Sequence, residues 1–123
     1  MNFFKPNEFI VPDYWQDKIK TLVTAKEWIS KIYPKETIPV AVVQANDKSE
    51  AWECYNILKT QGYNKIAFSY GADWFYSEGL STTPNKNNKW VTKAHGRYNT
   101  IKEFYNKGLI SKFDRVHLLG CNI

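Results

Sequence analysis

Short apolar segments alternate along this chain with longer segments whose apolar residues recur at helical spacing. The short segments are rich in β-branched and aromatic residues, which is typical of strands. They are EFIVP (Glu8–Pro12), IPVAVVQ (Ile38–Gln44), KIAFSY (Lys65–Tyr70) and RVHLLG (Arg115–Gly120). The second shows no alternation with polar residues, so we expect that strand to be covered on both faces of its sheet.

Three amphipathic helices are predicted between the strands. They extend from Asp17 to Ile32, from Asp47 through Lys59, and from about Trp90 to Gly108. Asp47 and Glu50 have the spacing of a capping box, and Gly62 lies just past the second helix, where a left-handed cap is common. The polar stretch 77–88 is expected to be a loop.

The resulting order, βαβαβαβ, predicts an α/β fold. Connections of this kind are right-handed and place the strands parallel in one sheet. The length of 123 residues suits one domain with one modest core. No repeat or linker divides the chain, and we therefore treat residues 1–123 as a single α/β unit.

The composition is that of a packed globular protein, with 43% hydrophobic and 16% aromatic residues. No apolar run approaches ~18 residues, so no membrane partner is expected. The first residues, MNFFKPNEF, lack the basic and apolar regions of a secretory signal, and Cys54 and Cys121 make no disulfide framework. A cytoplasmic location is the expectation. His95 and His117 form no metal-binding spacing with these cysteines, so we expect no metal and no cofactor.

Basic residues exceed acidic ones, 17 against 12, and the formal net charge is +5. The densest basic stretch holds Lys86, Lys89, Lys93 and Arg97 around Trp90. Basic side chains interleaved with an aromatic residue can contact a nucleic-acid backbone. A solvated loop and helix face would show the same pattern, so both interpretations of this stretch stay open.

Hydrogen-bonding groups lie at the end of every predicted strand. Asp13 follows the first strand, Gln44 ends the second, residues 69–71 (Ser69, Tyr70 and Gly71) follow the third, and Gly120 ends the fourth. Because the carboxyl ends of parallel strands meet at one edge of a sheet, these groups should share that edge. Ligands of parallel α/β proteins bind there, so the sequence predicts a site at this edge.

Several of these residues also have a purely structural interpretation. Asp13 could cap the following helix, and Gly71 could serve only a turn. Gln44 is neither a preferred cap nor a usual strand residue, and its amide suits the edge of a planar base. Nearby aromatic residues such as Tyr14 and Trp74 could pack in the core or stack on a heterocycle. The pattern favours a ligand role for Gln44 and leaves the other assignments open.

Most of the chain resembles one enzyme family. The matching segments are VPDYWQDKIKT (Val11–Thr21), PVAVVQANDKSEAWECYNILKTQGYNKIAFS (Pro39–Ser69), HGRYNTIKEFYNKGLI (His95–Ile110) and RVHLLGCN (Arg115–Asn122). In order and spacing they resemble the catalytic barrel of tRNA-guanine transglycosylases, most closely the phage-type relatives that place 7-deazaguanines in DNA. The resemblance implies half of a (β/α)8 TIM barrel whose strand ends bind a guanine-like base.

The resemblance also implies roles for single residues. Asp13 matches the carboxylate that accepts from the ring N–H and exocyclic amine of the base, and Gln44 matches the residue at its carbonyl edge. One of Ser69, Tyr70 and Gly71 would supply a backbone amide. Leu119 would pack on the base face beside the turn at Gly120. The family's usual Gln-Gly pair is Gln44-Ala45 here.

The nucleophilic Asp and the zinc site of that family lie outside the matched segments. We therefore expect a fragment or split subunit of a guanine or 7-deazaguanine transglycosylase acting on tRNA or DNA, able to recognise a base but inactive alone. A complementing barrel half or a homo-oligomer would be its partner, in the host cytoplasm if the protein is phage-encoded. Two alternatives stay open. One is a non-catalytic purine-binding protein, and the other is a phage-type protein that binds nucleic acid through its basic stretch.

Overall fold

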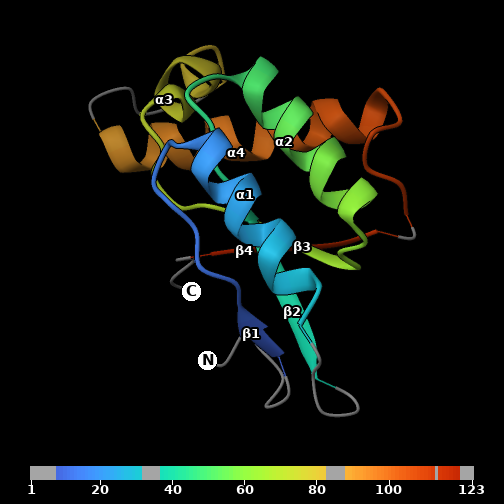
Figure 1. The fold of residues 1–123 in the computed structure, drawn as a ribbon. Coiled ribbons are helices and arrows are strands. Elements are labelled where there is room, and N and C mark those ends of the chain that lie inside the picture. The colour runs from blue at the N-terminus through green and yellow to red at the C-terminus, as the bar shows by residue number, and fades with distance from the viewer. Residues whose placement is uncertain (1–7, 32–36, 83–87, 113, 120–123) are drawn as a thin grey trace.

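The computed structural model describes residues 8–31, 37–82, 88–112 and 114–119. The elements are, in order, β1 (Glu8–Ile10), α1 (Lys18–Ile29), β2 (Ile38–Val43), α2 (Lys48–Gln61), β3 (Lys65–Phe68), α3 (Trp74–Gly79), α4 (Lys89–Asn106) and β4 (Arg115–Leu118). Figure 1 shows them along the chain, with α3 beside α4. All four predicted strands are present, and the prediction of an α/β fold is confirmed.

The strands form one parallel sheet in the order β1-β2-β3-β4. Glu8 pairs with Ile38, Val40 with Lys65, and Lys65 with Arg115. Neighbours in sequence are therefore neighbours in the sheet, which is the strand order of a (β/α)8 barrel. The predicted parallel βαβαβαβ arrangement is confirmed, while its interpretation as half of a barrel stays a prediction.

The main core lies between one face of the sheet and the helices. Ala41 and Val43 of β2 face this core together with Phe68 of β3. The ring of Tyr55 from α2 stacks on Phe68 with centroids 5.8 Å apart, and Phe104 from α4 lies 6.2 Å from the same ring. Because strand residues alternate between faces, the intervening Val40, Val42 and Ala67 form a second buried cluster on the opposite face. Burial on both faces explains the continuous apolar run of β2.

Local capping signals predicted several helix ends correctly. The Asp47 carboxylate accepts from the Glu50 N–H at 2.7 Å, and the Glu50 side chain accepts from the Asn46 N–H at 2.9 Å. Gly62 ends α2 in the left-handed conformation with φ of 107°. Helix α1 is capped by Asp17, whose carboxylate accepts from the Lys20 N–H at 3.0 Å. Capping therefore does not account for Asp13.

Two predicted boundaries are wrong. The first helix ends at Ile29 and not at Ile32, because Ser30 serves as its C-cap and its hydroxyl donates to the carbonyl of Glu27 at 2.7 Å. Residues 77–79, expected to lie in a loop, belong to helix α3. A six-residue helix has little stability of its own, so its existence depends on its packing against α4.

Two glycines allow that packing. A Cβ on Gly79 would lie 2.7 Å from the backbone nitrogen of Gly96, and a Cβ on Gly96 would lie 2.6 Å from the carbonyl carbon of Phe75. Real Cβ atoms do not approach backbone this closely, so the two helices can meet only because both positions lack a side chain. No local pattern in the sequence predicts this contact between the two helices.

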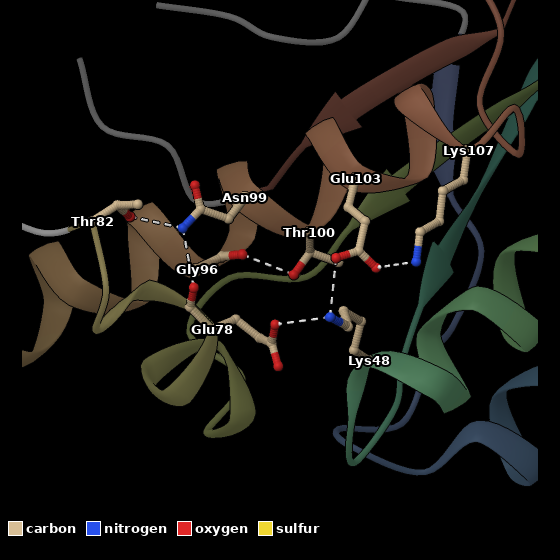
Figure 2. A network of polar contacts seen from close by, with 8 residues as sticks. All are labelled: Lys48, Glu78, Thr82, Gly96, Asn99, Thr100, Glu103 and Lys107. Carbon is tan, nitrogen blue, oxygen red and sulfur yellow. Dashed lines mark hydrogen bonds and ion pairs between the residues drawn. The ribbon is translucent and has the colours of Figure 1, made fainter.

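Polar contacts link this helix pair to the start of α2. Figure 2 shows the Lys48 ammonium between two carboxylates, 3.3 Å from Glu78 of α3 and 3.0 Å from Glu103 of α4. The Asn99 amide donates to the Glu78 carbonyl at 3.0 Å and to the Thr82 hydroxyl at 2.7 Å. These contacts hold α3 and the following turn against α4.

None of the helices in the part of the chain that the structure describes is long and apolar enough to cross a membrane.

Candidate functional site

Two of the predicted site residues meet at the carboxyl edge of the sheet. The Gln44 amide nitrogen donates to the Asp13 carboxylate across 2.6 Å, although the residues are 31 positions apart. Asp13 follows β1 and Gln44 follows β2, so the pairing of these two strands brings them together. Gln44 is only 3% exposed, whereas Asp13 is partly open to solvent. A hydrogen bond to a charged group in this half-buried setting fixes the direction of the carboxylate.

The carbonyl oxygen of the Gln44 side chain is also occupied. It accepts from the backbone N–H of Gln16 at 2.8 Å. Gln16 itself has φ of 53°, a left-handed conformation that a residue with a side chain adopts only at a cost. The Gln16 side-chain oxygen in turn accepts from the Asp73 N–H at 2.8 Å. One chain of hydrogen bonds therefore joins the loops that follow β1, β2 and β3.

These contacts change the role expected for Gln44. Its amide carries two donor hydrogens, of which one bonds Asp13, and its oxygen is held by Gln16. The side chain that remains open is that of Asp13, whose second oxygen, Oδ1, accepts no hydrogen bond from the described residues. Asp13 is thus the group available to a ligand, and Gln44 positions it.

The end of β3 is held by two buried cations from α4. The Lys93 ammonium donates to the Gly71 carbonyl at 2.9 Å and contacts the Asp73 carboxylate at 3.2 Å. The Arg97 guanidinium donates to the carbonyls of Ser69 at 3.1 Å and Leu119 at 2.7 Å. The main chain at Ser69 and Gly71 is therefore fixed by side chains from a helix that follows them in the sequence.

The interpretation of the stretch with Lys86, Lys89, Lys93 and Arg97 as a solvated loop and helix face is wrong for two of these residues, while its contact with nucleic acid stays a prediction. Lys93 and Arg97 are 4% and 5% exposed, because their donors are needed by main-chain carbonyls at the sheet edge. Lys89 is exposed at the start of α4, and Lys86 lies outside the described residues. The stretch therefore does not form one solvated basic face.

The Tyr70 side chain is exposed, although the carbonyls of its neighbours Ser69 and Gly71 accept hydrogen bonds from buried cations. Its ring is stacked on the Trp90 ring, with centroids 5.6 Å apart and an interplanar angle of 16°. Gly71 has φ of +78°, and a Cβ there would lie 2.8 Å from the Trp90 ring. Gly71 therefore serves the turn that its structural interpretation gave it, and it also leaves room for the Trp90 ring.

Leu119 packs against the second cluster, on the sheet face opposite the helices. Its backbone N–H donates to the Phe68 carbonyl at 3.1 Å, which continues the pairing of β4 with β3 by one residue. Gly120, predicted beside it, lies outside the described residues. Leu119 therefore lies at this edge as part of an apolar surface, and its contact with a base stays a prediction.

Three residues of the edge were missed from the sequence. Gln16 gives no signal, because nothing local indicates that it adopts a left-handed conformation. Asp73 lies two residues beyond the predicted group 69–71, and Trp90 was considered only as a neighbour of basic residues. A pattern could have indicated Trp90, because it recurs with Lys93 and Arg97 at helical spacing on one face of α4.

Other ionisable groups lie away from this edge. Burial raises the pKa of the Cys54 thiol to about 11, and burial followed by the charge of Lys65 lowers the pKa of His117. No three or more His, Cys, Asp or Glu side chains gather into a possible metal site within residues 8–31, 37–82, 88–112 and 114–119.

The fold and this edge define a parallel α/β unit with a polar network at the carboxyl ends of its strands. No family model, no curated protein and no solved structure matches the chain. The resemblance to the transglycosylases accordingly stays a prediction.

Proposed function

We propose that this chain binds a guanine-like base at the carboxyl edge of its sheet, with Asp13 as the recognition residue. The observation that carries the proposal is the contact between Asp13 and Gln44, which presents a partly open, oriented carboxylate at the edge where parallel α/β proteins bind ligands. Each carboxylate oxygen has two lone pairs, so Asp13 can accept two parallel hydrogen bonds from a ligand although Gln44 already donates to one of its oxygens. Guanine and 7-deazaguanine offer that pair of donors in the ring N–H and the exocyclic amine, whereas adenine does not.

The surroundings of Asp13 support this assignment. Gln44 occupies one carboxylate oxygen from the protein side, and the hydrogen bond from Gln16 keeps the Gln44 amide from turning. The site therefore needs little rearrangement on binding, which lowers the entropic cost of association. Leu119, on the sheet face away from the helices, provides an apolar surface for the ring system.

The choice of a guanine-like base, and of tRNA or DNA as its source, comes from the resemblance described above. In that family a nucleophilic Asp attacks the sugar carbon to form a covalent intermediate, and the matched segments do not contain it. We therefore propose that base exchange requires a complementing barrel half, and that this chain alone recognises the base without exchanging it.

Calorimetric titration with free guanine, and with adenine as the comparison, tests the proposal. Asp13→Asn keeps the shape of the side chain and an acceptor for Gln44 but removes the charge and one acceptor. The substitution should weaken guanine binding about 10- to 150-fold, as expected for the loss of a hydrogen bond worth about 1.5–3 kcal/mol. Glu27→Gln, the same chemical change at an exposed position on α1, is the matched control.

Guanine and adenine binding with equal affinity would contradict the proposal, as would Asp13→Asn binding guanine as tightly as the unaltered protein. Thermal unfolding of each variant verifies that the fold is intact. Addition of a candidate complementing chain, followed by a labelled-guanine exchange assay on tRNA and on DNA, tests the catalytic part separately.

A further inference from the structure

An ordered aromatic pair lies in solvent at the same edge of the sheet. Tyr70 and Trp90 are stacked on each other, yet they are 45% and 55% exposed. Two stacked rings that are both open to solvent offer a flat aromatic surface on which the ring of a ligand can stack. The pair joins the end of β3 to the start of α4, two elements separated by the whole of α3.

Contacts with Gly71, Lys93 and Arg97 hold this pair in place. The left-handed turn at Gly71 lets the Trp90 ring lie against the backbone, where a Cβ would collide with it. The Lys93 ammonium lies 4.9 Å from the centre of the Trp90 ring, and the Arg97 guanidinium lies 5.7 Å from that of Tyr70. Both cations are themselves fixed by main-chain carbonyls. The rings are therefore presented in one arrangement and lose little freedom when a ligand stacks on them.

We propose that the Tyr70–Trp90 pair is a stacking site for an unpaired base of single-stranded nucleic acid. Aromatic rings stack on the face of any base, and an exposed cation near the rings attracts the phosphates on either side of it. Lys89, exposed and adjacent to Trp90, adds a further positive charge, and the whole chain carries +5. These features distinguish the pair from a simple apolar patch, which would offer no charge to a strand.

The position of the pair extends the proposed function. Tyr70 follows β3, and Asp13 follows β1, so the two sites are separated by two strand spacings, or roughly 10 Å. A base held at Asp13 and a base stacked at the aromatic pair can therefore belong to one strand. Only the statement that both bases belong to one strand rests on the proposed function. The stacking site itself could bind any unpaired base.

Fluorescence anisotropy with a short labelled oligothymidylate measures the stacking site alone, because the strand contains no guanine. Trp90→Ala and Tyr70→Ala should each weaken binding about 5- to 150-fold, the equivalent of about 1–3 kcal/mol per stacked base. Trp90→Phe keeps a ring and should retain most of the affinity. Tyr105→Ala, which removes an exposed tyrosine near the other end of α4, is the matched control and should change affinity little.

An abasic oligonucleotide of the same length separates stacking from phosphate attraction. It should bind the unaltered protein about as weakly as the oligothymidylate binds Trp90→Ala. The inference is overturned if the abasic strand binds equally well, if no oligothymidylate binding occurs at low salt, or if Trp90→Ala and Tyr70→Ala remain folded and bind normally. The oligothymidylate experiment tests the aromatic pair and the guanine titration tests Asp13. A negative result in one of them therefore leaves the other proposal standing.

Discussion

Because α3 packs closely on α4 at Gly96, we predict that Gly96→Ala destabilises the protein. In an exposed helix this substitution is stabilising, since alanine favours the helix by about 1 kcal/mol over glycine. In this protein the new methyl group would lie 2.6 Å from the carbonyl carbon of Phe75 and 3.0 Å from its Cα. These are backbone atoms, so no side-chain rotation relieves the collision.

The magnitude follows from how far the helices must separate. An ordinary contact begins at 3.4 Å, so α3 would have to move by about 1 Å or more in an interior packed like a solid. Overpacking of a core costs typically 1–3 kcal/mol, and a backbone obstacle places the cost at the upper end. Movement of α3 also loosens Phe75, which is 1% exposed. After the gain in helix propensity, we expect a net loss of about 2 kcal/mol, or a fall in Tm of roughly 8 °C.

Urea denaturation followed by circular dichroism measures this change. Ala94→Gly is the matched control, because Ala94 is exposed two residues earlier in α4 and reports the propensity term alone. It should destabilise the protein by about 1 kcal/mol. If Gly96→Ala proved more stable than the unaltered protein, the close packing of α3 on α4 would be refuted, since propensity alone would then account for the result.

Three further predictions concern the edge of the sheet and buried groups. Gln44→Met should lower the free energy of unfolding by about 2–3 kcal/mol, because it leaves the Gln16 N–H without its acceptor. Urea denaturation measures this, and a change below about 0.5 kcal/mol would contradict the prediction. Burial raises the pKa of the Cys54 thiol to about 11, so Cys54 should not react with iodoacetamide until the protein unfolds. Peptide-level mass spectrometry measures the labelling, and fast labelling of the native state would contradict this prediction. His117 has its pKa lowered, first by burial and then by Lys65, so its folded form binds a proton less readily than its unfolded form. Its contribution to stability is therefore full above the ordinary value of 6.5 and is lost as the pH falls through the lowered pKa. An NMR titration giving a His117 pKa at or above 6.5 would refute this.

Local patterns predicted much of the backbone. The four strands were found because apolar β-branched runs favour extended structure, and their alternation with helices implied a parallel sheet. The capping box at Asp47 and the left-handed end at Gly62 were also predictable, because capping depends on residues within one turn. Helix α3 was not predictable, because six residues of mixed character become helical here through packing against Gly96.

At the edge of the sheet, too, some features could be predicted from the sequence and others could not. That Asp13 and Gln44 would lie at one edge followed from chain topology, since parallel strands end together. That the Gln44 amide would be used to orient Asp13 depended on Gln16, which has a left-handed conformation and bonds both Gln44 after β2 and Asp73 after β3. Sequence reasoning could place the residues at the edge but could not say which side chains the protein itself would occupy.

The basic residues of α4 show most clearly what each level determined. By itself the sequence determined the fold class, the order of the elements and the edge at which polar groups collect, because these depend on periodicity and on the direction of the chain. Only the tertiary structure decided that Lys93 and Arg97 are buried. Main-chain carbonyls at the end of β3 need donors, and α4 passes close enough to supply them. The same contacts leave Tyr70 and Trp90 in solvent, because the cations and not the rings occupy the interior.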